Sequence, residues 1–288
     1  MFNIAIVFAL VAVAIWSISG TIERKVAQRL HASRSALLVA SFGVIPILMI
    51  FVLSVTAQNG YIIILSLLSG VFWTIGAVLL YKTLETEQVS NATGFVLIQT
   101  LLIFAFGVVG LGESVSVLSV VGGAILVCGV ALLATKMGSL KLNRKLLPAL
   151  FGNLGFAVYW ILLSAGIVSA GQIAAPMILS RIASSFFAIA LFALFAKAQP
   201  KKVQVGKSAI MKHALLFGAV AGLLDGLGNG INSFVVTLGQ LAIAGIIFSL
   251  SPLFTIMLAR IFYKERLDKV QWIGVAVAII GAIILAVG

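Results

Sequence analysis

Ten long apolar runs, separated by short polar or Gly- and Pro-containing breaks, constrain what this chain can fold into. A run of about 20 apolar residues is long enough to cross the hydrocarbon core of a bilayer as an α-helix. With 62% hydrophobic and 9% charged residues, the chain does not have the composition of a soluble domain. We therefore predict an all-α membrane protein with ten transmembrane helices. The runs are 2–20, 35–56, 61–81, 89–109, 115–135, 146–168, 174–196, 214–238, 242–262 and 270–287.

Basic residues lie at every second connection between these runs. Of the 19 Lys and Arg residues, only Arg181 lies away from the odd-numbered connections. Since cytoplasmic loops carry the excess of Lys and Arg, this pattern predicts a protein of the cell membrane with both termini outside. The net charge of +12 is then explained by topology and by contact with membrane lipid headgroups, and no nucleic-acid partner is needed.

The two halves of the chain repeat each other, which predicts two five-helix units, residues 1–137 and 144–288. An odd number of helices in each unit makes the two units run through the membrane in opposite senses. Inverted repeats of this kind are typical of transporters, with the substrate site between the halves near the bilayer midplane. A shift of 152 positions pairs Gly70 with Gly222, Gly76 with Gly228, Glu113 with Glu265, Gly122 with Gly274, and Gly129 with Gly281.

Several segments resemble the drug/metabolite transporter superfamily, in particular its ten-helix EamA family. They are AIWSISGTIERKVAQRL and LLSGVFWTIGAVLLYK in the first half, SLSPLFTIMLARIFYKERL in the second, and the Leu-Gly-Glu turn that ends at Glu113. The chain departs from the family at Ser17, where a Gly often follows the Trp. It also departs at Thr100, which occupies the place that Pro252 keeps in the second half. Without that proline, the fourth helix is expected to be straighter than the ninth.

The resemblance implies a secondary active transporter of small metabolites, an exporter of amino acids or related compounds, with proton coupling as a further hypothesis. An uptake permease for an organic cation or sugar is one alternative, and a lipid flippase-like protein is another. We expect no enzymatic activity and no cofactor, because the sequence contains no phosphate-binding loop, nucleophile elbow or metalloprotease motif. The expected partner is a small-molecule substrate, bound by a monomer or a homodimer. No metal site is expected, because His31 and His213 stand alone.

Residues 211–238 form the helix with the strongest candidate site. Gly218, Gly222, Gly226 and Gly230 recur every fourth residue and predict close packing of another helix. Asp225, Asn229 and Asn232 form a neighbouring polar stripe at membrane depth. A carboxylate at the membrane centre costs about 2.5 to 3.5 kcal/mol on insertion scales, so Asp225 needs a compensating partner or a function. It either binds protons or a cationic substrate, or it is held by Arg181 or by hydroxyl groups on a neighbouring helix.

The remaining candidate substrate residues are Arg181, Trp16, Trp73 and Trp160. Arg181 is expected either to hold an anionic substrate group or to extend to the membrane interface. The tryptophans are expected either to wall a pocket for an apolar or cationic substrate or to pack between helices. Trp73 is the preferred one, because the 152-residue shift pairs it with Asp225.

Three glutamates at the ends of predicted helices are expected to act as caps or interface residues. Glu113 and Glu265 lie in corresponding connections of the two repeats, beside polar or basic residues. Glu85 precedes the fourth run, where its charge would complement the dipole at the start of that helix. We assign none of these three carboxylates to the substrate site.

Overall fold

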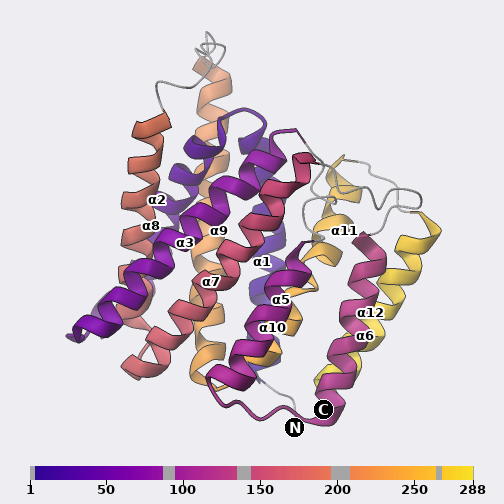
Figure 1. The fold of residues 1–288 in the computed structure, drawn as a ribbon. Coiled ribbons are helices and arrows are strands. Elements are labelled where there is room, and N and C mark those ends of the chain that lie inside the picture. Colours follow the sequence, from indigo (N-terminus) through magenta and orange to yellow (C-terminus); the bar gives the residue numbers. More distant parts are fainter. Residues whose placement is uncertain (1–3, 87–94, 135–143, 196–207, 264–267, 288) are drawn as a thin grey trace.

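The computed structural model describes residues 4–86, 95–134, 144–195, 208–263 and 268–287, and in these ranges the chain is a bundle of helices without strands (Figure 1). The first half contains α1 (Ile4–Ala27), α2 (Ala32–Phe51), η1 (Val52–Ser54), α3 (Gly60–Leu84), α5 (Val96–Ala105), η2 (Phe106–Gly110) and α6 (Val117–Ala134). The second half contains η3 (Arg144–Leu146), α7 (Leu147–Ala170), α8 (Ala174–Phe195), α9 (Ser208–Thr237), α10 (Leu241–Phe248), α11 (Ser251–Tyr263) and α12 (Lys269–Val287).

These helices confirm the predicted all-α membrane fold. Within the described residues, six helices are long and apolar enough to cross a membrane. Shorter apolar segments supply the rest: α5 with η2, α6, α10 continued by α11, and α12. The protein is therefore a multi-pass membrane protein.

The helix contacts are almost the same when the two halves are exchanged. The packing of α3 on α7 corresponds to that of α1 on α9, and the packing of α2 on α9 corresponds to that of α3 on α8. The pairs α2 with α8, α6 with α12, and α5 with α10 each map onto themselves. This pseudo-symmetry is what two inverted repeats produce, and it places the interface between the halves at the centre of the bundle.

The two ends of the bundle differ in charge. The connections at 55–59, 111–116, 171–173 and 238–240 contain no Lys or Arg and lie at the lower end in Figure 1, together with the start of α1 and the end of α12. The other ends of α1 and α3 lie at the upper end in Figure 1, which is called the basic end below. Arg24 and Lys25 are in the last turn of α1, Arg29 follows in the connection to α2, and Lys82 is in the last turn of α3. The charge pattern in the sequence thus becomes a real asymmetry between the two faces of the bundle.

The glycine stripe of α9 packs on α2, as predicted. A Cβ atom on Gly222 would lie 2.8 Å from the carbonyl oxygen of Val39, and one on Gly226 would lie 2.7 Å from Cγ of Pro46. Both distances are shorter than a van der Waals contact, so the two backbones approach as closely as they do because these positions lack side chains.

The ninth transmembrane segment is broken just before Pro252, whereas the fourth has no break at Thr100. The fourth changes from α-helix to a π-helical stretch further along, at Phe106–Gly110. The chain leaves α10 after Phe248 and starts α11 at Ser251, with Pro252 as the second helical residue. Proline is tolerated in the first turn of a helix, where its missing N–H is not needed. In the first half, α5 continues through Thr100. The break lies at the level of the cavity described below.

Glu113 caps a helix, as expected from its position in the Leu-Gly-Glu turn. Its two carboxylate oxygens accept hydrogen bonds from the backbone N–H groups of Leu241, at 2.8 Å, and Ala242, at 2.7 Å. A carboxylate at a helix N-terminus satisfies unpaired donors and complements the helix dipole. The first repeat thereby holds the start of α10 in the second. Glu265 lies outside the described residues.

Glu85 caps a helix that the sequence analysis did not predict. Its Oε1 accepts a hydrogen bond of 2.7 Å from the backbone N–H of Ala32, the first residue of α2. The sequence could not indicate this, because the two residues are 53 positions apart and meet only when α3 packs beside α2. The residues that lead from Glu85 into the fourth run lie outside the described ones, so its expected role there stays a prediction.

Candidate functional site

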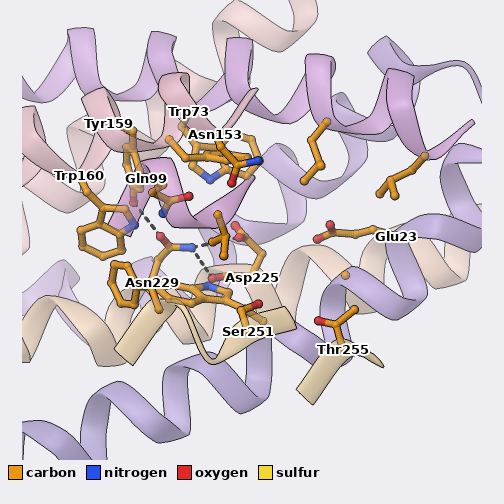
Figure 2. Close-up of a pocket in the computed structure, with 17 residues that line it drawn as sticks. Glu23, Trp73, Gln99, Asn153, Tyr159, Trp160, Asp225, Asn229, Ser251 and Thr255 are labelled. Carbon is orange, nitrogen blue, oxygen red and sulfur yellow. Dashed lines mark hydrogen bonds between the residues drawn. The ribbon is translucent and has the colours of Figure 1, made fainter. Parts of the chain in front are cut away.

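A cavity of about 160 Å³ lies between the two halves of the bundle (Figure 2). Its walls come from α1, α3 and α5 of the first half and from α7, α9, α10 and α11 of the second. Since both repeats contribute, the cavity occupies the interface at which an inverted-repeat transporter binds its substrate. The lining residues are Trp16, Gly20, Glu23, Trp73, Leu80, Leu84, Val96, Gln99, Asn153, Phe156, Tyr159, Trp160, Asp225, Asn229, Phe248, Ser251 and Thr255.

The cavity extends from the middle of the bundle toward the basic end. On α1 its lining starts at Trp16 and continues through Glu23, in the half of that helix nearer the basic end. On α3 the lining reaches Leu84, the last residue of that helix, and on α5 it reaches Val96, the first residue. The structure therefore corresponds to a state in which the site lies closer to the basic face of the membrane.

A cluster of aromatic rings bounds the cavity toward the opposite end. The ring of Trp16 lies 5.9 Å from that of Trp160 and 5.2 Å from that of Phe248, and the latter two rings are 5.7 Å apart. Such edge-on and tilted contacts are favourable for aromatic pairs and resist displacement. The three residues come from α1, α7 and α10, so both halves contribute to this barrier.

A second aromatic layer lies beyond the first, near the end opposite the basic one. The ring of Phe234 is 6.1 Å from that of Phe8 and 5.8 Å from that of Phe51. These residues lie near the start of α1, at the end of α2 and near the end of α9. These rings pack α1, α2 and α9 together at the end of the bundle opposite the basic one.

Asp225 is paired with Arg181. Nη1 of Arg181 donates to Oδ2 of Asp225 at 2.8 Å, and the arginine side chain is fully buried. The pair lies against α2 at Gly43, where a Cβ atom would be 3.6 Å from Nη1 and 3.7 Å from Oδ2. The predicted alternative in which Asp225 pairs with Arg181 is therefore confirmed. Asp225 nevertheless also lines the cavity, with 9% of its surface exposed.

A chain of hydrogen bonds continues from this ion pair along the cavity wall (Figure 2). The amide nitrogen of Asn229 donates to Oδ1 of Asp225 at 3.0 Å, and the Tyr159 hydroxyl donates to Oδ1 of Asn229 at 2.8 Å. The guanidinium carbon of Arg181 lies 4.9 Å from the ring centroid of Trp73 and 6.0 Å from that of Tyr159. Ring faces thus help to compensate the buried cation.

Five of the seven predicted site residues line this one cavity: Asp225, Asn229, Trp73, Trp16 and Trp160. Arg181 lies behind Asp225 and does not belong to the cavity wall, and it does not extend to the membrane interface. Asn232 is also fully buried away from the cavity. Its side-chain nitrogen and oxygen have no hydrogen-bond partner among the described residues.

The sequence reasoning missed Glu23 and Tyr159. Glu23 lies in the cavity wall, seven residues after Trp16 and on the same face of α1. That spacing is two helical turns and would have predicted the shared face. The sequence does not make Glu23 stand out as a membrane-depth acid, because it directly precedes Arg24 and Lys25 at the start of a basic connection.

The arrangement is suited to binding a small solute. Within the part of the chain that the structure describes, no group of three or more His, Cys, Asp or Glu side chains could hold a metal ion. Aromatic faces can hold an apolar or cationic group, and the carboxylate and amides can orient a polar one. Two carboxyl groups also give the cavity the capacity to bind and release protons.

Three comparisons with known proteins bear on this fold. The model of the EamA-like transporter family matches residues 3–135 and again residues 143–287. A solved structure described only as "Crystal structure of protein" superposes with a TM-score of 0.73 at 15% sequence identity, covering 99% of this chain and 96% of that chain. This similarity concerns the fold alone. No curated protein sequence matches the chain significantly.

Proposed function

Because this chain belongs to the EamA-like transporter family, whose members move small molecules across membranes, we propose that it is a secondary active transporter that binds its substrate in the central cavity. The observation that carries this proposal is the cavity itself. Both inverted halves line it at mid-bundle, and a cluster of aromatic rings bounds it toward one face of the membrane. Alternating access requires such a site, because the mirror-related arrangement of the halves would open it to the other face.

The proposed substrates are amino acids or related compounds, and the proposed direction is export. Asp225 and Asn229 would bind an ammonium group, since a carboxylate has further lone pairs beyond those used in its two hydrogen bonds. Trp16, Trp73 and Trp160 would surround the apolar part of the molecule. A cavity of about 150 Å³ in another protein accommodates benzene, so a solute of amino-acid size fits the volume here.

An organic cation is the second candidate substrate. It is favoured by the aromatic walls and by two carboxyl groups that face the same cavity (Figure 2). A lipid is a poor candidate, because a cavity of about 160 Å³ is far smaller than a two-chain lipid.

We propose that the protein lies in the cell membrane with its basic end in the cytoplasm and both termini outside. In this orientation the cavity lies toward the cytoplasm, which is where an exporter would load its substrate. The site is complete within one chain, which supports a monomer as the working unit. Epitope tags at both termini, probed in intact cells, test the orientation. Labelling of both tags without permeabilisation is expected, and labelling of only one would contradict it.

Ligand-induced stabilisation of the purified protein tests the substrate class. A bound ligand raises stability by RT ln(1 + [L]/Kd), so a panel of amino acids, amines, organic cations and sugars can be ranked by thermal shift at two pH values. Compounds that stabilise the protein should also support counterflow in proteoliposomes. The proposal is contradicted if none of them is exchanged while labelled phospholipid is moved between leaflets.

A further inference from the structure

Glu23 is a buried carboxyl group to which the proposed amino-acid site gives no role. It lies on α1 with 8% of its surface exposed and forms part of the cavity wall on the side of the basic end. Figure 2 shows its carboxyl group on the side that faces Asp225. Unlike Asp225, it forms no ion pair with any described residue. A buried acid is compensated either by a partner or by binding a proton.

The groups that face Glu23 come from three directions. Ser19, one turn earlier on α1, lies within hydrogen-bonding distance. Tyr81 on α3 and Asp225 on α9 are close enough to act on its charge. Lys25 on α1 lies over the ring of Phe217, with Nζ 5.7 Å from the ring centroid. Two acids thus face the cavity, and Arg181, the buried cation behind its wall, is bonded to Asp225.

The hydroxyl of Ser19 lies between two oxygen atoms. Its Oγ is 2.8 Å from Oε1 of Glu23 and 2.9 Å from the backbone carbonyl oxygen of Ala221 on α9. A hydroxyl has one proton to donate, and an ionised carboxylate and a carbonyl are both acceptors. If Glu23 is ionised, Ser19 can donate its proton to only one of the two oxygens, and the other short oxygen–oxygen contact has no hydrogen atom to bridge it. If Glu23 is protonated, its O–H donates to Ser19 and Ser19 donates to Ala221, and both contacts are hydrogen bonds.

We propose that Glu23 is a proton-binding site of the transport cycle, protonated in this structure, and that its protonation controls the hydrogen bond between Ser19 and Ala221. On release, the O–H bond of Glu23 breaks and the proton passes to a water molecule at the basic end of the cavity. The carboxylate left behind then draws the Ser19 hydrogen to itself, and Ala221 loses its hydrogen bond from α1. No other atom or charge is transferred.

The position of this hydrogen bond connects the proton site to the substrate site. It joins α1 of the first half to α9 of the second, and these two helices pack along the interface between the repeats. Ala221 lies one helical turn before Asp225. Loss of the bond therefore weakens the contact between the halves beside the carboxylate proposed to bind substrate. The link to transport depends on the proposed function, whereas the protonation of Glu23 does not.

Infrared difference spectroscopy of the purified protein tests the protonation directly. Between two pH values that bracket the release, the wild-type protein should lose the carbonyl-stretching band of a protonated carboxyl group. Glu23→Gln should lack this band and Asp225→Asn should keep it. A band that is absent from the wild type, or that disappears in Asp225→Asn and persists in Glu23→Gln, would overturn the proposal. If Glu23→Gln fails to fold, Ser19→Ala decides, because the band must shift when the acceptor of its O–H is removed.

Proton flux in proteoliposomes tests the coupling. The number of protons moved per substrate molecule exchanged is measured with a pH-sensitive dye trapped in the lumen. Glu23→Gln should abolish the proton movement, because the amide donates to Ser19 as the protonated acid does but carries no exchangeable charge. Glu85→Gln, which alters a carboxyl outside the cavity, should keep the wild-type ratio. An unchanged ratio in Glu23→Gln contradicts the coupling. If the wild type exchanges no substrate, the proposed function fails and the infrared result still decides the protonation.

Discussion

Arg181 and Asp225, on α8 and α9, form a buried ion pair with 2.8 Å between Nη1 and Oδ2. The acid that the sequence places at membrane depth is thus compensated by the one Lys or Arg residue that lies away from the odd-numbered connections. The pair does not withdraw Asp225 from the cavity, because its carboxylate still lines the wall beside Asn229. A structural role and a role in binding are therefore compatible at this residue.

Arg181→Met is expected to destabilise the protein strongly. Removing one member of a buried ion pair leaves an uncompensated charge and typically costs about 3 to 5 kcal/mol. The loss should appear as a lowered unfolding temperature in detergent. The double variant Arg181→Met with Asp225→Asn should recover most of it, because no unpaired charge remains. A double variant that is no more stable than Arg181→Met would show that the pair does not act as a unit.

Asp225→Asn is expected to weaken substrate binding by roughly ten- to a hundredfold. The substitution keeps the shape of the side chain but removes the charge, and a hydrogen bond to a charged group contributes about 1.5 to 3 kcal/mol. Counterflow and thermal shift with a compound identified in the panel provide the measurement. Asp268→Asn, at a carboxylate that caps the start of α12 away from the cavity, serves as the matched control. Wild-type affinity and an unchanged pH dependence in Asp225→Asn would exclude both the binding and the coupling role of this carboxylate.

Gly226→Ala is expected to destabilise the packing of α9 on α2 by about 1 to 3 kcal/mol, the usual cost of overpacking. The added Cβ would meet the backbone carbonyl of Gly43 and lie 2.7 Å from Cγ of Pro46. Neither neighbour can rotate away as the end of a long side chain can. Gly60→Ala, where nothing lies within 4 Å of the added atom, should leave the unfolding temperature unchanged or slightly raised. Equal effects of the two substitutions would exclude packing as the cause.

A cysteine at Ser251 should react with a membrane-impermeant thiol reagent supplied from the basic end. Ser251 lines the cavity, whose wall extends toward that end and is bounded by a cluster of aromatic rings at the other. The experiment requires a Cys128→Ser background, because Cys128 is exposed. Ser233→Cys, which replaces a fully buried side chain outside the cavity, should be protected from both sides. Faster labelling of Ser251→Cys from the opposite end would contradict the assigned direction of access.

Much of the fold follows from properties that can be read along the chain. The number of spans follows from the length of the apolar runs. The two-repeat architecture follows from the 152-residue shift, and its inversion from the odd number of helices in each half. The close packing of a helix on α9 follows from glycines at every fourth position, although only the structure shows that this helix is α2. The break between α10 and α11 follows from Pro252. Each of these depends on residues within one segment or on a simple shift between halves.

The sequence by itself therefore determined which segments cross the membrane, how the halves are related and which polar residues lie at membrane depth. Only the tertiary structure decided which of those residues share a cavity. It placed Arg181 behind Asp225, buried Asn232 elsewhere, and brought Glu23 and Tyr159 into the wall. Hydropathy and charge can be read from the residues of one helix. A cavity, in contrast, depends on how helices that are far apart in the chain are rotated and packed against each other. Ser19 and Ala221, 202 positions apart, meet only because α1 and α9 turn these faces toward each other.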